Sequence, residues 1–456
     1  MQKKNFVLPK LSINYFNILN LLLVCFPVSI FIGTGAINLI VFLICSIGLI
    51  MFSKKIFIFK NNKTTSILFL FFLLLFLTTI IDGIRYPENN NVLKALLYFR
   101  YFILFIVISY FVKSGKFNLK YFLISISVCT IFLSLDIIYQ FFNGADFFGF
   151  VGYGDNNTLH LAGFLKNEYI AGGYIQRFLI FSLVLLPCLL IKNKSFRYTV
   201  PVMLMSIFFS GILFSGNRMP LFIFIFSIIL CIILIKEIRY QLLVGTIFCV
   251  TIFYFTLSTQ ERFKIYYESF YYNAKAVVEN INDFAFKKYP DLEKNKNNYF
   301  VGEIFKGNKK YKEYELVRWG SGHPVIYLTA IDVWKDRPIL GHGIKSFREK
   351  CKNKLHLPNR VCQAHPHNYY LEFLNDVGIL GIVIFLIFLV LIFRERILNL
   401  KKIKVDEKLI LYCLVIIIVS ELFPLRSSGS FFSTQISSYI FLILGILGGF
   451  KKTKIN

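Results

Sequence analysis

The chain has 456 residues, of which 56% are hydrophobic and 53 are phenylalanine, and its mean hydropathy is +0.63. A soluble globular protein is about 45–50% apolar and lacks repeated apolar stretches of roughly 20 residues, so the composition excludes that class. The net charge of +26 is explained mostly by lysines in loops between apolar segments, so we expect no nucleic-acid partner. A basic excess outside the membrane would suit an anionic, phosphate-bearing substrate.

Twelve apolar segments are predicted to span the membrane, each about as long as a hydrocarbon core of ~30 Å requires of a helix. The first follows basic residues, as in a signal peptide, but its length and the spans that follow it predict an uncleaved first span. The segments lie near 13–32, 35–52, 65–82, 93–112, 119–141, 173–192, 198–214, 219–236, 241–258, 368–393, 407–424 and 434–450.

The loops alternate in charge along the chain. Segments on one side, which include both termini, hold 24 lysines and arginines, whereas the short loops on the other side hold four: Arg85, Lys166, Arg218 and Arg426. The positive-inside rule therefore places both termini in the cytoplasm and the loop from about 259 to 367 outside.

The predicted fold is an all-α polytopic membrane protein with about twelve transmembrane helices and a large helical periplasmic loop between spans nine and ten. Residues 1–258 form the bundle of spans one to nine, residues 259–367 form a periplasmic loop domain, and residues 368–456 form spans ten to twelve. The loop domain is long enough to cap the bundle.

Two outer loops precede this domain. The loop near 142–172 is rich in glycine, aromatic and acidic residues, and it is either a surface or re-entrant loop or part of a substrate cleft. Arg218, in SGNRMPL, lies at the predicted N-terminus of span eight, with Pro220 in the first turn. A helix N-terminus favours anions, although an arginine at the membrane interface can also simply extend its charged end into water.

The large loop contains a predicted amphipathic helix at 324–336, PVIYLTAIDVWKD, with proline at its first turn. Cys351 and Cys362 are the two cysteines that we place outside the membrane. That compartment is oxidising, so we expect a disulfide between them; two free thiols are the alternative. Their spacing from nearby histidines matches no standard zinc site, and we expect no metal.

The segment 337–381 holds four of the six histidines of the chain. Two of them, in HPHN at 365–368, lie where the loop enters span ten. An imidazole at this position can be neutral near pH 7 and can accept a proton from a hydroxyl.

Three charged residues fall inside predicted spans: Arg100, Arg177 and Glu421. Such residues are costly in lipid and usually face the bundle interior or a wet cavity. They either pair with each other or line a path, and the second alternative would favour a transporter.

These motifs resemble a known family. GHGIKSF, then HPHNYYLEFLNDVGILG and an apolar run, is similar to the shared loop motif of the bacterial O-antigen ligase and O-antigen polymerase superfamily. GSGHPVIYLTAIDVWKDRPILGHG also fits, and SGNRMP resembles the family's outer arginine motif. The layout of spans and loops matches as well.

The resemblance implies a membrane glycosyltransferase of the GT-C kind, without a metal, a nucleotide sugar or another cofactor. Its donor would be an undecaprenyl-diphosphate-linked glycan. By the same resemblance His367 is the catalytic base, with His365 as a second candidate, and Arg218 and Arg262 hold the diphosphate.

The chain departs from the family pattern at two positions. His323 stands where the family often has arginine, and Tyr327 stands at the usual tryptophan. His323 therefore joins the expected diphosphate-binding residues, and Arg318 is a further candidate that could replace the missing arginine.

Three functions remain open at this point. A ligase would move a finished O-antigen to lipid A–core, a polymerase would extend carrier-linked glycan, and a transporter would use the charged residues within the spans. The ligase is the leading hypothesis, with the carrier-linked donor, the lipid A–core acceptor and the surrounding lipids of the bacterial inner membrane as partners.

Overall fold

The structure is a computed structural model. It describes residues 14–56, 62–87, 91–152, 160–166, 170–261, 263, 264, 267, 299–306, 309–318, 323–357, 360–397, 404–427 and 429–450. Each of the predicted spans coincides with a helix or a continuous helical run. The all-α polytopic membrane class expected from the apolar segments is therefore confirmed, with one small β-hairpin as the exception within the described residues.

Eleven of the predicted spans each correspond to one helix: α1 (Tyr15–Ile32), α2 (Thr34–Ile56), α3 (Lys63–Arg85), α4 (Val92–Lys113), α5 (Leu119–Asn143), α8 (Lys194–Phe214), α9 (Arg218–Leu234), α10 (Arg239–Thr259), α14 (Tyr369–Ile397), α15 (Val405–Glu421) and α16 (Thr434–Gly449). Of these, α14 has a kink at Gly378, where the backbone is not helical. The sixth span is a run of α6 (Ala171–Ile180), a π-helical turn at Phe181–Leu185 and α7 (Leu186–Leu190). Within the described residues, nine helical segments are long and apolar enough to cross a membrane. The remaining three, α9, α15 and α16, have 17, 17 and 16 residues, at the lower limit for a spanning helix.

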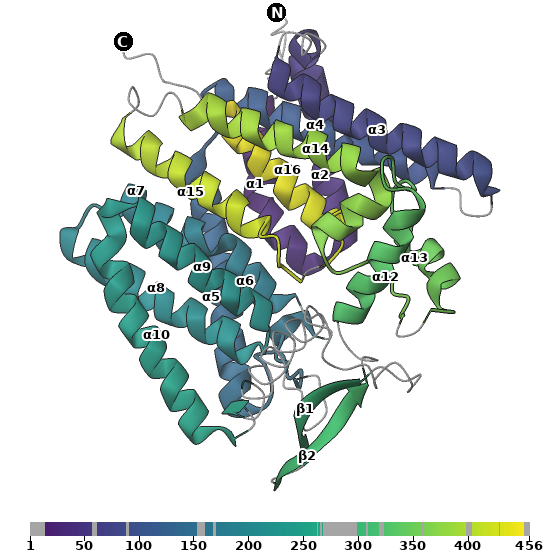
Figure 1. Ribbon diagram of the computed structural model, residues 1–456. Coiled ribbons are helices and arrows are strands. Elements are labelled where there is room, and N and C mark those ends of the chain that lie inside the picture. The colour runs from purple at the N-terminus through teal and green to yellow at the C-terminus, as the bar shows by residue number, and fades with distance from the viewer. Residues whose placement is uncertain are drawn as a thin grey trace, which may run out of the picture.

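The helices form two groups (Figure 1). One contains α1–α4, α14 and α16, and the other contains α5–α10 with α15 beside α9. Aromatic rings fill the first group: Phe72 of α3 meets Phe102 of α4 and Phe441 of α16 at centroid distances of 5.7 and 5.3 Å. Contacts of α1 with α5 and of α15 with α16 join the groups.

A small helical unit, here called the cap (residues 323–367), lies against α14. It contains α12 (His323–Asp336), α13 (Phe347–Lys350) and a short 3-10 turn at Cys351–Lys354. Its own apolar core consists of Ile326, Ala330, Val333, Phe347 and Cys351, and Leu371 of α14 packs against it. The predicted amphipathic helix at 324–336 is α12, and its apolar face is buried in this core.

The large outer loop also contains a β-hairpin that the helical expectation for this loop did not include. The antiparallel strands β1 (Tyr299–Lys306) and β2 (Lys309–Arg318) pair Tyr299 with Arg318 (Figure 1). The sequence carries the signal for it, because two strand-like runs flank Gly307 and Asn308, a pair typical of tight hairpin turns.

The glycine-rich segment 341–347 fastens the cap to α14. The amide of Gly343 donates to the backbone carbonyl of Asp376 at 2.8 Å. The Asp376 carboxylate accepts from the amides of Lys345 at 2.6 Å and Ser346 at 3.1 Å. A buried carboxylate needs such partners, so these bonds determine where the segment lies.

A second buried carboxylate, Asp82 near the C-terminal end of α3, ties the cap to the first group of helices. Its Oδ1 lies 3.0 Å from Nη1 of Arg337 and 3.1 Å from Nζ of Lys350. Removing one partner of a buried pair leaves an uncompensated charge, so this contact holds the cap firmly against α3.

We expect Gly378→Ala to destabilise the protein far more than Gly115→Ala. Both glycines have a positive φ, 65° and 73° respectively, but a Cβ at Gly378 would overlap the Ile339 carbonyl, whereas nothing lies within 4 Å at Gly115. Backbone strain alone costs about 1 kcal/mol, and the overlap should raise the loss at Gly378 above about 3 kcal/mol. Thermal unfolding in detergent measures both, and equal losses would contradict the close packing of the cap on the α14 kink.

Candidate active site

Three histidines, here called the histidine cluster (His323, His365 and His367), meet where the cap joins α14. The ring centroids of His365 and His367 are 4.1 Å apart, and those of His323 and His367 are 4.9 Å apart. His323 is exposed at the start of α12, while the other two are half-buried in the loop before α14. The fold thus brings both predicted catalytic histidines together with His323, and His367 contacts both of the others.

The backbone around His367 is held in an unusual conformation. His367 has a φ of 58°, which residues other than glycine seldom adopt and which often marks a functional site. Oδ1 of Asn368 accepts from the amides of Tyr370 and Leu371 at 3.0 and 3.1 Å, so it caps α14. Its Nδ2 donates to the Pro424 carbonyl at 2.8 Å. Asn368 therefore positions His367 relative to both α14 and the turn after α15.

A buried ion network lies next to this helix start. Glu421, the last residue of α15, is 3.2 Å from Nε of Arg177 and 2.8 Å from Nη1 of Arg426. The Tyr369 hydroxyl donates to the same carboxylate at 2.9 Å. Of the two alternatives for the charges inside the spans, Arg177 and Glu421 therefore follow the first: they pair with each other. The network joins α6, α14 and α15.

Burial and neighbouring positive charge keep His365 neutral. Burial, aided by the charges of His367, Arg348, His323 and Lys345, lowers the pKa of His365 to about 4. Its Nε2 is buried and has no hydrogen-bond partner among the described residues. A neutral imidazole with a nitrogen available as an acceptor can receive a proton or a hydrogen bond from a bound hydroxyl.

Arg218 is half-buried as the first residue of α9. His160, from the loop between α5 and α6, hydrogen-bonds the Ser215 backbone; burial, together with the nearby Arg218 charge, lowers the pKa of His160. A Cβ on Gly172 would come within 2.5 Å of the Ser215 hydroxyl. The start of α6 therefore packs closely on the turn between α8 and α9, which contains Ser215. The outer loop near 142–172 thus contributes to the surroundings of Arg218.

Arg218 and His367 are linked through one turn of the chain, the residues that follow α15. Phe222, one helical turn after Arg218, contacts Phe423 with a centroid distance of 5.4 Å. The residue after His367 donates to the carbonyl of Pro424 at 2.8 Å. The guanidinium-bearing end of α9 and the histidine-bearing start of α14 are therefore both packed on this turn.

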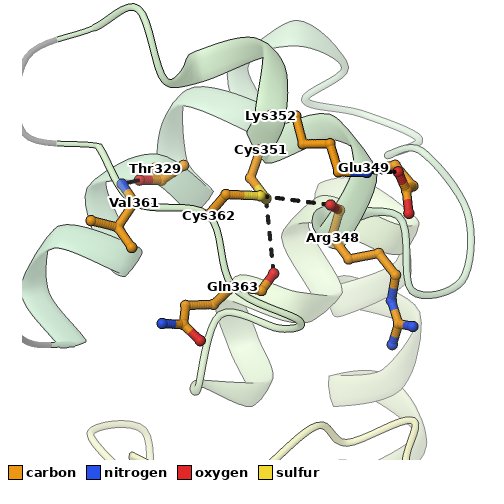
Figure 2. The surroundings of a disulfide bond; sticks show 8 residues. All are labelled: Thr329, Arg348, Glu349, Cys351, Lys352, Val361, Cys362 and Gln363. Atoms are coloured by element: carbon orange, nitrogen blue, oxygen red, sulfur yellow. Dashed lines mark hydrogen bonds and ion pairs between the residues drawn. A yellow bond between two sulfur atoms is a disulfide. The ribbon is translucent and has the colours of Figure 1, made fainter.

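Cys351 and Cys362 form a disulfide, with their Cα atoms 5.2 Å apart (Figure 2). The Cys362 sulfur lies 3.6 Å from the Arg348 carbonyl oxygen, and the Cys351 sulfur lies 3.8 Å from that of Gln363 (Figure 2). The bond closes a loop that ends three residues before His365. It therefore limits the freedom of the segment that carries the catalytic candidates.

Ion pairs fasten this disulfide loop to α12. Nε of Arg360 lies 2.6 Å from Asp332, and Nζ of Lys354 lies 2.7 Å from Asp336. Burial would raise the pKa of Asp332, but the hydrogen bonds and charges of Arg360 and Lys335 lower it below its ordinary value. The loop is thus attached to α12 at two points as well as through its disulfide.

The positions of two predicted diphosphate-binding residues relative to the histidine cluster are not described by the structure. Arg262 lies outside the described residues, and Arg318 ends β2 with its side chain outside the described part. Their assignment stays a prediction.

Several residues that organise the site were missed by reasoning from the sequence. Asn368 directly follows His367, Asp376 lies in NDVG within an apolar run, and Arg426 is one of the few basic residues in the outer loops. Polar residues in or beside a span usually have partners, so each could have been singled out. Which partner each one takes depends on tertiary contacts that no sequence spacing reveals.

Two cavities within the described residues lie elsewhere. One of about 590 Å³ lies between α1 and α5, and one of about 420 Å³ is lined by the C-terminal end of α4 and the N-terminal half of α15 among others. Neither is lined by a predicted site residue. Within the described residues, no group of three histidine, cysteine, aspartate or glutamate side chains is arranged to hold a metal ion.

A comparison with known protein families identifies a match. Residues 202–386 match the family model described as O-antigen ligase. The match begins in α8 and ends in α14, so it includes Arg218, the cap and the histidine cluster. No curated protein matches the chain. The resemblance to the O-antigen ligase and polymerase superfamily is confirmed, and it supports ligase or polymerase activity in general.

We expect acid to destabilise the folded protein partly through His365. Its pKa of about 4 lies below the ordinary value of about 6.5, so in this range the unfolded chain binds a proton that the folded protein does not. The free energy of unfolding should therefore fall as the pH drops from about 6.5 to about 4. Above about pH 6.5, His365 is neutral in both states and does not make the free energy of unfolding depend on pH.

The measurement compares unfolding temperatures in detergent at about pH 7 and about pH 4.5. His365→Gln should make the difference smaller, because the substituted side chain does not titrate. His356→Gln, an exposed histidine of the cap, is the matched control. A His365→Gln protein as acid-sensitive as the wild type would contradict the lowered pKa.

Proposed function

We propose that this multi-pass membrane protein is an O-antigen ligase. The proposal starts from the match of residues 202–386 to the O-antigen ligase family model. The enzyme transfers a glycan from an undecaprenyl-diphosphate carrier to lipid A–core on the periplasmic side of the bacterial inner membrane. The observation that carries the proposal is the histidine cluster at the start of α14, linked to Arg218 through the turn after α15.

The reaction breaks one bond and forms one bond at the anomeric carbon of the donor. His367 removes the proton from the acceptor hydroxyl, and the oxygen attacks the anomeric carbon. The bond to the diphosphate oxygen breaks, and the carrier leaves as undecaprenyl diphosphate. Arg218 binds the diphosphate and stabilises the charge that develops on it, as guanidinium groups do for phosphates.

The other two histidines assist this proton transfer. Two imidazoles in contact cannot readily carry two positive charges, so neutral His365 beside His367 leaves room for one proton in the pair. His323 contacts His367 and is exposed, so it can pass that proton on to water. The predicted contact of His323 with the diphosphate would require it to reach the opposite side of the sugar from His367, so it stays a prediction outside this mechanism.

The orientation in the membrane follows from charge and from the disulfide. Both termini are in the cytoplasm, because the basic loops are on their side. The Cys351–Cys362 bond supports an oxidising, outer location for the cap. The cap, Arg218 and the histidine cluster then face the periplasm, where the finished carrier-linked glycan is used.

The alternatives differ in what supports them. A polymerase would use the same donor and the same residues, so geometry does not favour either. A transporter would need Arg177 and Glu421 available at a midplane site, but these two residues pair with each other and with Arg426 and Tyr369. The transporter is therefore the weaker alternative.

We expect His367→Ala to lower the transfer rate by about 10²–10⁴ and Arg218→Ala by about 10²–10³, as for a lost general base and a lost charge-stabilising donor. In cells, a ligase variant should leave long glycan on the carrier and bare core on lipopolysaccharide, whereas a polymerase variant should leave core capped by single repeat units. Gel electrophoresis of lipopolysaccharide distinguishes these patterns. Normal lipopolysaccharide in both variants would overturn the assignment.

We expect Asn368→Ala to abolish most transfer, while Asn193→Ala leaves transfer intact. Asn193 caps α8 by accepting from the Ser195 amide at 2.9 Å, so each substitution should cost about 1 kcal/mol as a lost cap. Only Asn368 also fixes the backbone of His367. Transfer assays on membranes with equal protein levels measure the difference, and equal activity of the two variants would rule out the positioning role of Asn368.

A further inference from the structure

Two cations of the cap, Lys345 and Arg348, lie beside the histidine cluster. Lys345 is half-buried and has a left-handed backbone with a φ of 55°, held by the 2.6 Å hydrogen bond from its amide to Asp376. Arg348 is exposed on α13, and its backbone contacts the disulfide that precedes His365 (Figure 2). The positive charges of both side chains act on His365.

These two cations differ from the other basic residues of the cap. Within the described residues, neither Lys345 nor Arg348 forms an ion pair. The others each do: Lys335 and Arg360 with Asp332, Arg337 and Lys350 with Asp82, Lys352 with Glu349, and Lys354 with Asp336. The cap thus neutralises its other cations and leaves two uncompensated charges next to the catalytic candidates.

The nearest buried carboxylates do not neutralise this pair. Glu372 and Asp376 of α14 act electrostatically on Lys345 but form no ion pair with it. Asp376 accepts hydrogen bonds from backbone amides of the cap, and Glu372 accepts from the Ser430 hydroxyl at 2.5 Å and the Phe431 amide at 2.6 Å. Their oxygens are therefore already used within the protein, and the lysine is available for an external anion.

The location of the two cations indicates which substrate they meet. A base that activates an attacking hydroxyl lies on the face of the sugar ring opposite the leaving group. The charges of Lys345 and Arg348 act on His365, whose ring contacts the base His367, so we place the two cations on the acceptor side, whereas the leaving diphosphate belongs to Arg218. We propose that Lys345 and Arg348 form an anion subsite that binds a phosphate group of the acceptor glycan, an inference that rests on the proposed glycosyl transfer.

The test uses the full-length protein reconstituted with carrier-linked donor and with a phosphorylated core acceptor, intact or treated with phosphatase. Lys345→Met and Arg348→Met should each raise the KM for the intact acceptor about tenfold, the effect of losing one charge-assisted contact. The KM for the donor should change less than about twofold. Lys345→Arg should restore the acceptor KM, and Lys352→Met, which removes a cation paired with Glu349, is the matched control.

With the phosphatase-treated acceptor, the wild type should show the raised KM, and neither substitution should raise it further. A rise in the donor KM, or a loss that persists with the treated acceptor, would overturn the subsite. If Lys345→Met lowers the unfolding temperature, the acceptor KM of Arg348→Met, which changes an exposed residue, tests the subsite in its place.

The failure of this inference is distinguishable from failure of the proposed function. No transfer by the wild type, or full transfer by His367→Ala, would contradict the function and the subsite together. Transfer that requires His367 but has an unchanged acceptor KM in both methionine variants would contradict the subsite alone.

Discussion

The buried ion pairs of the Glu421 carboxylate are the interactions on which the rest of the site depends. The carboxylate is buried in the membrane-spanning bundle and neutralised by Arg177 and Arg426, and it also accepts from Tyr369. A charge in that environment is tolerated only with such partners, so three separate parts of the chain must meet there. One of them is the start of α14, two residues after His367. The location of the His367 imidazole is therefore a consequence of how a buried charge is satisfied.

The same principle extends to the cap. Asp82 and Asp376 are buried acceptors whose partners come from the cap, so the cap is attached to the bundle by polar contacts of high specificity. Its apolar core and disulfide give it internal rigidity. A rigid cap can hold His323 against His367 and can keep the neighbouring His365 partly out of water. This desolvation favours the neutral form of His365.

The sequence predicts the spans well because runs of about 20 apolar residues have one common use. It also predicts the importance of HPHN and SGNRMP, because their motifs resemble a family. It does not predict that Glu421 lies between two arginines, since Arg177 is far from Glu421 in the chain and Arg426 reaches it only through the fold of the turn after α15. The hairpin at 299–318 was missed because the loop was read for helical spacing alone. The role of Asn368 is not predicted because its partner, the Pro424 carbonyl, is distant in the chain.

The central claim is that one face of the protein presents an imidazole to the acceptor and a guanidinium to the leaving diphosphate. An experimental structure of the full-length protein bound to its undecaprenyl-diphosphate-linked glycan tests this most directly. The account predicts that the diphosphate contacts Arg218 and that the anomeric carbon faces His367 across a gap that an acceptor hydroxyl can fill. A diphosphate bound at the opposite end of the helices, or one shielded from His367 by the cap, would contradict it.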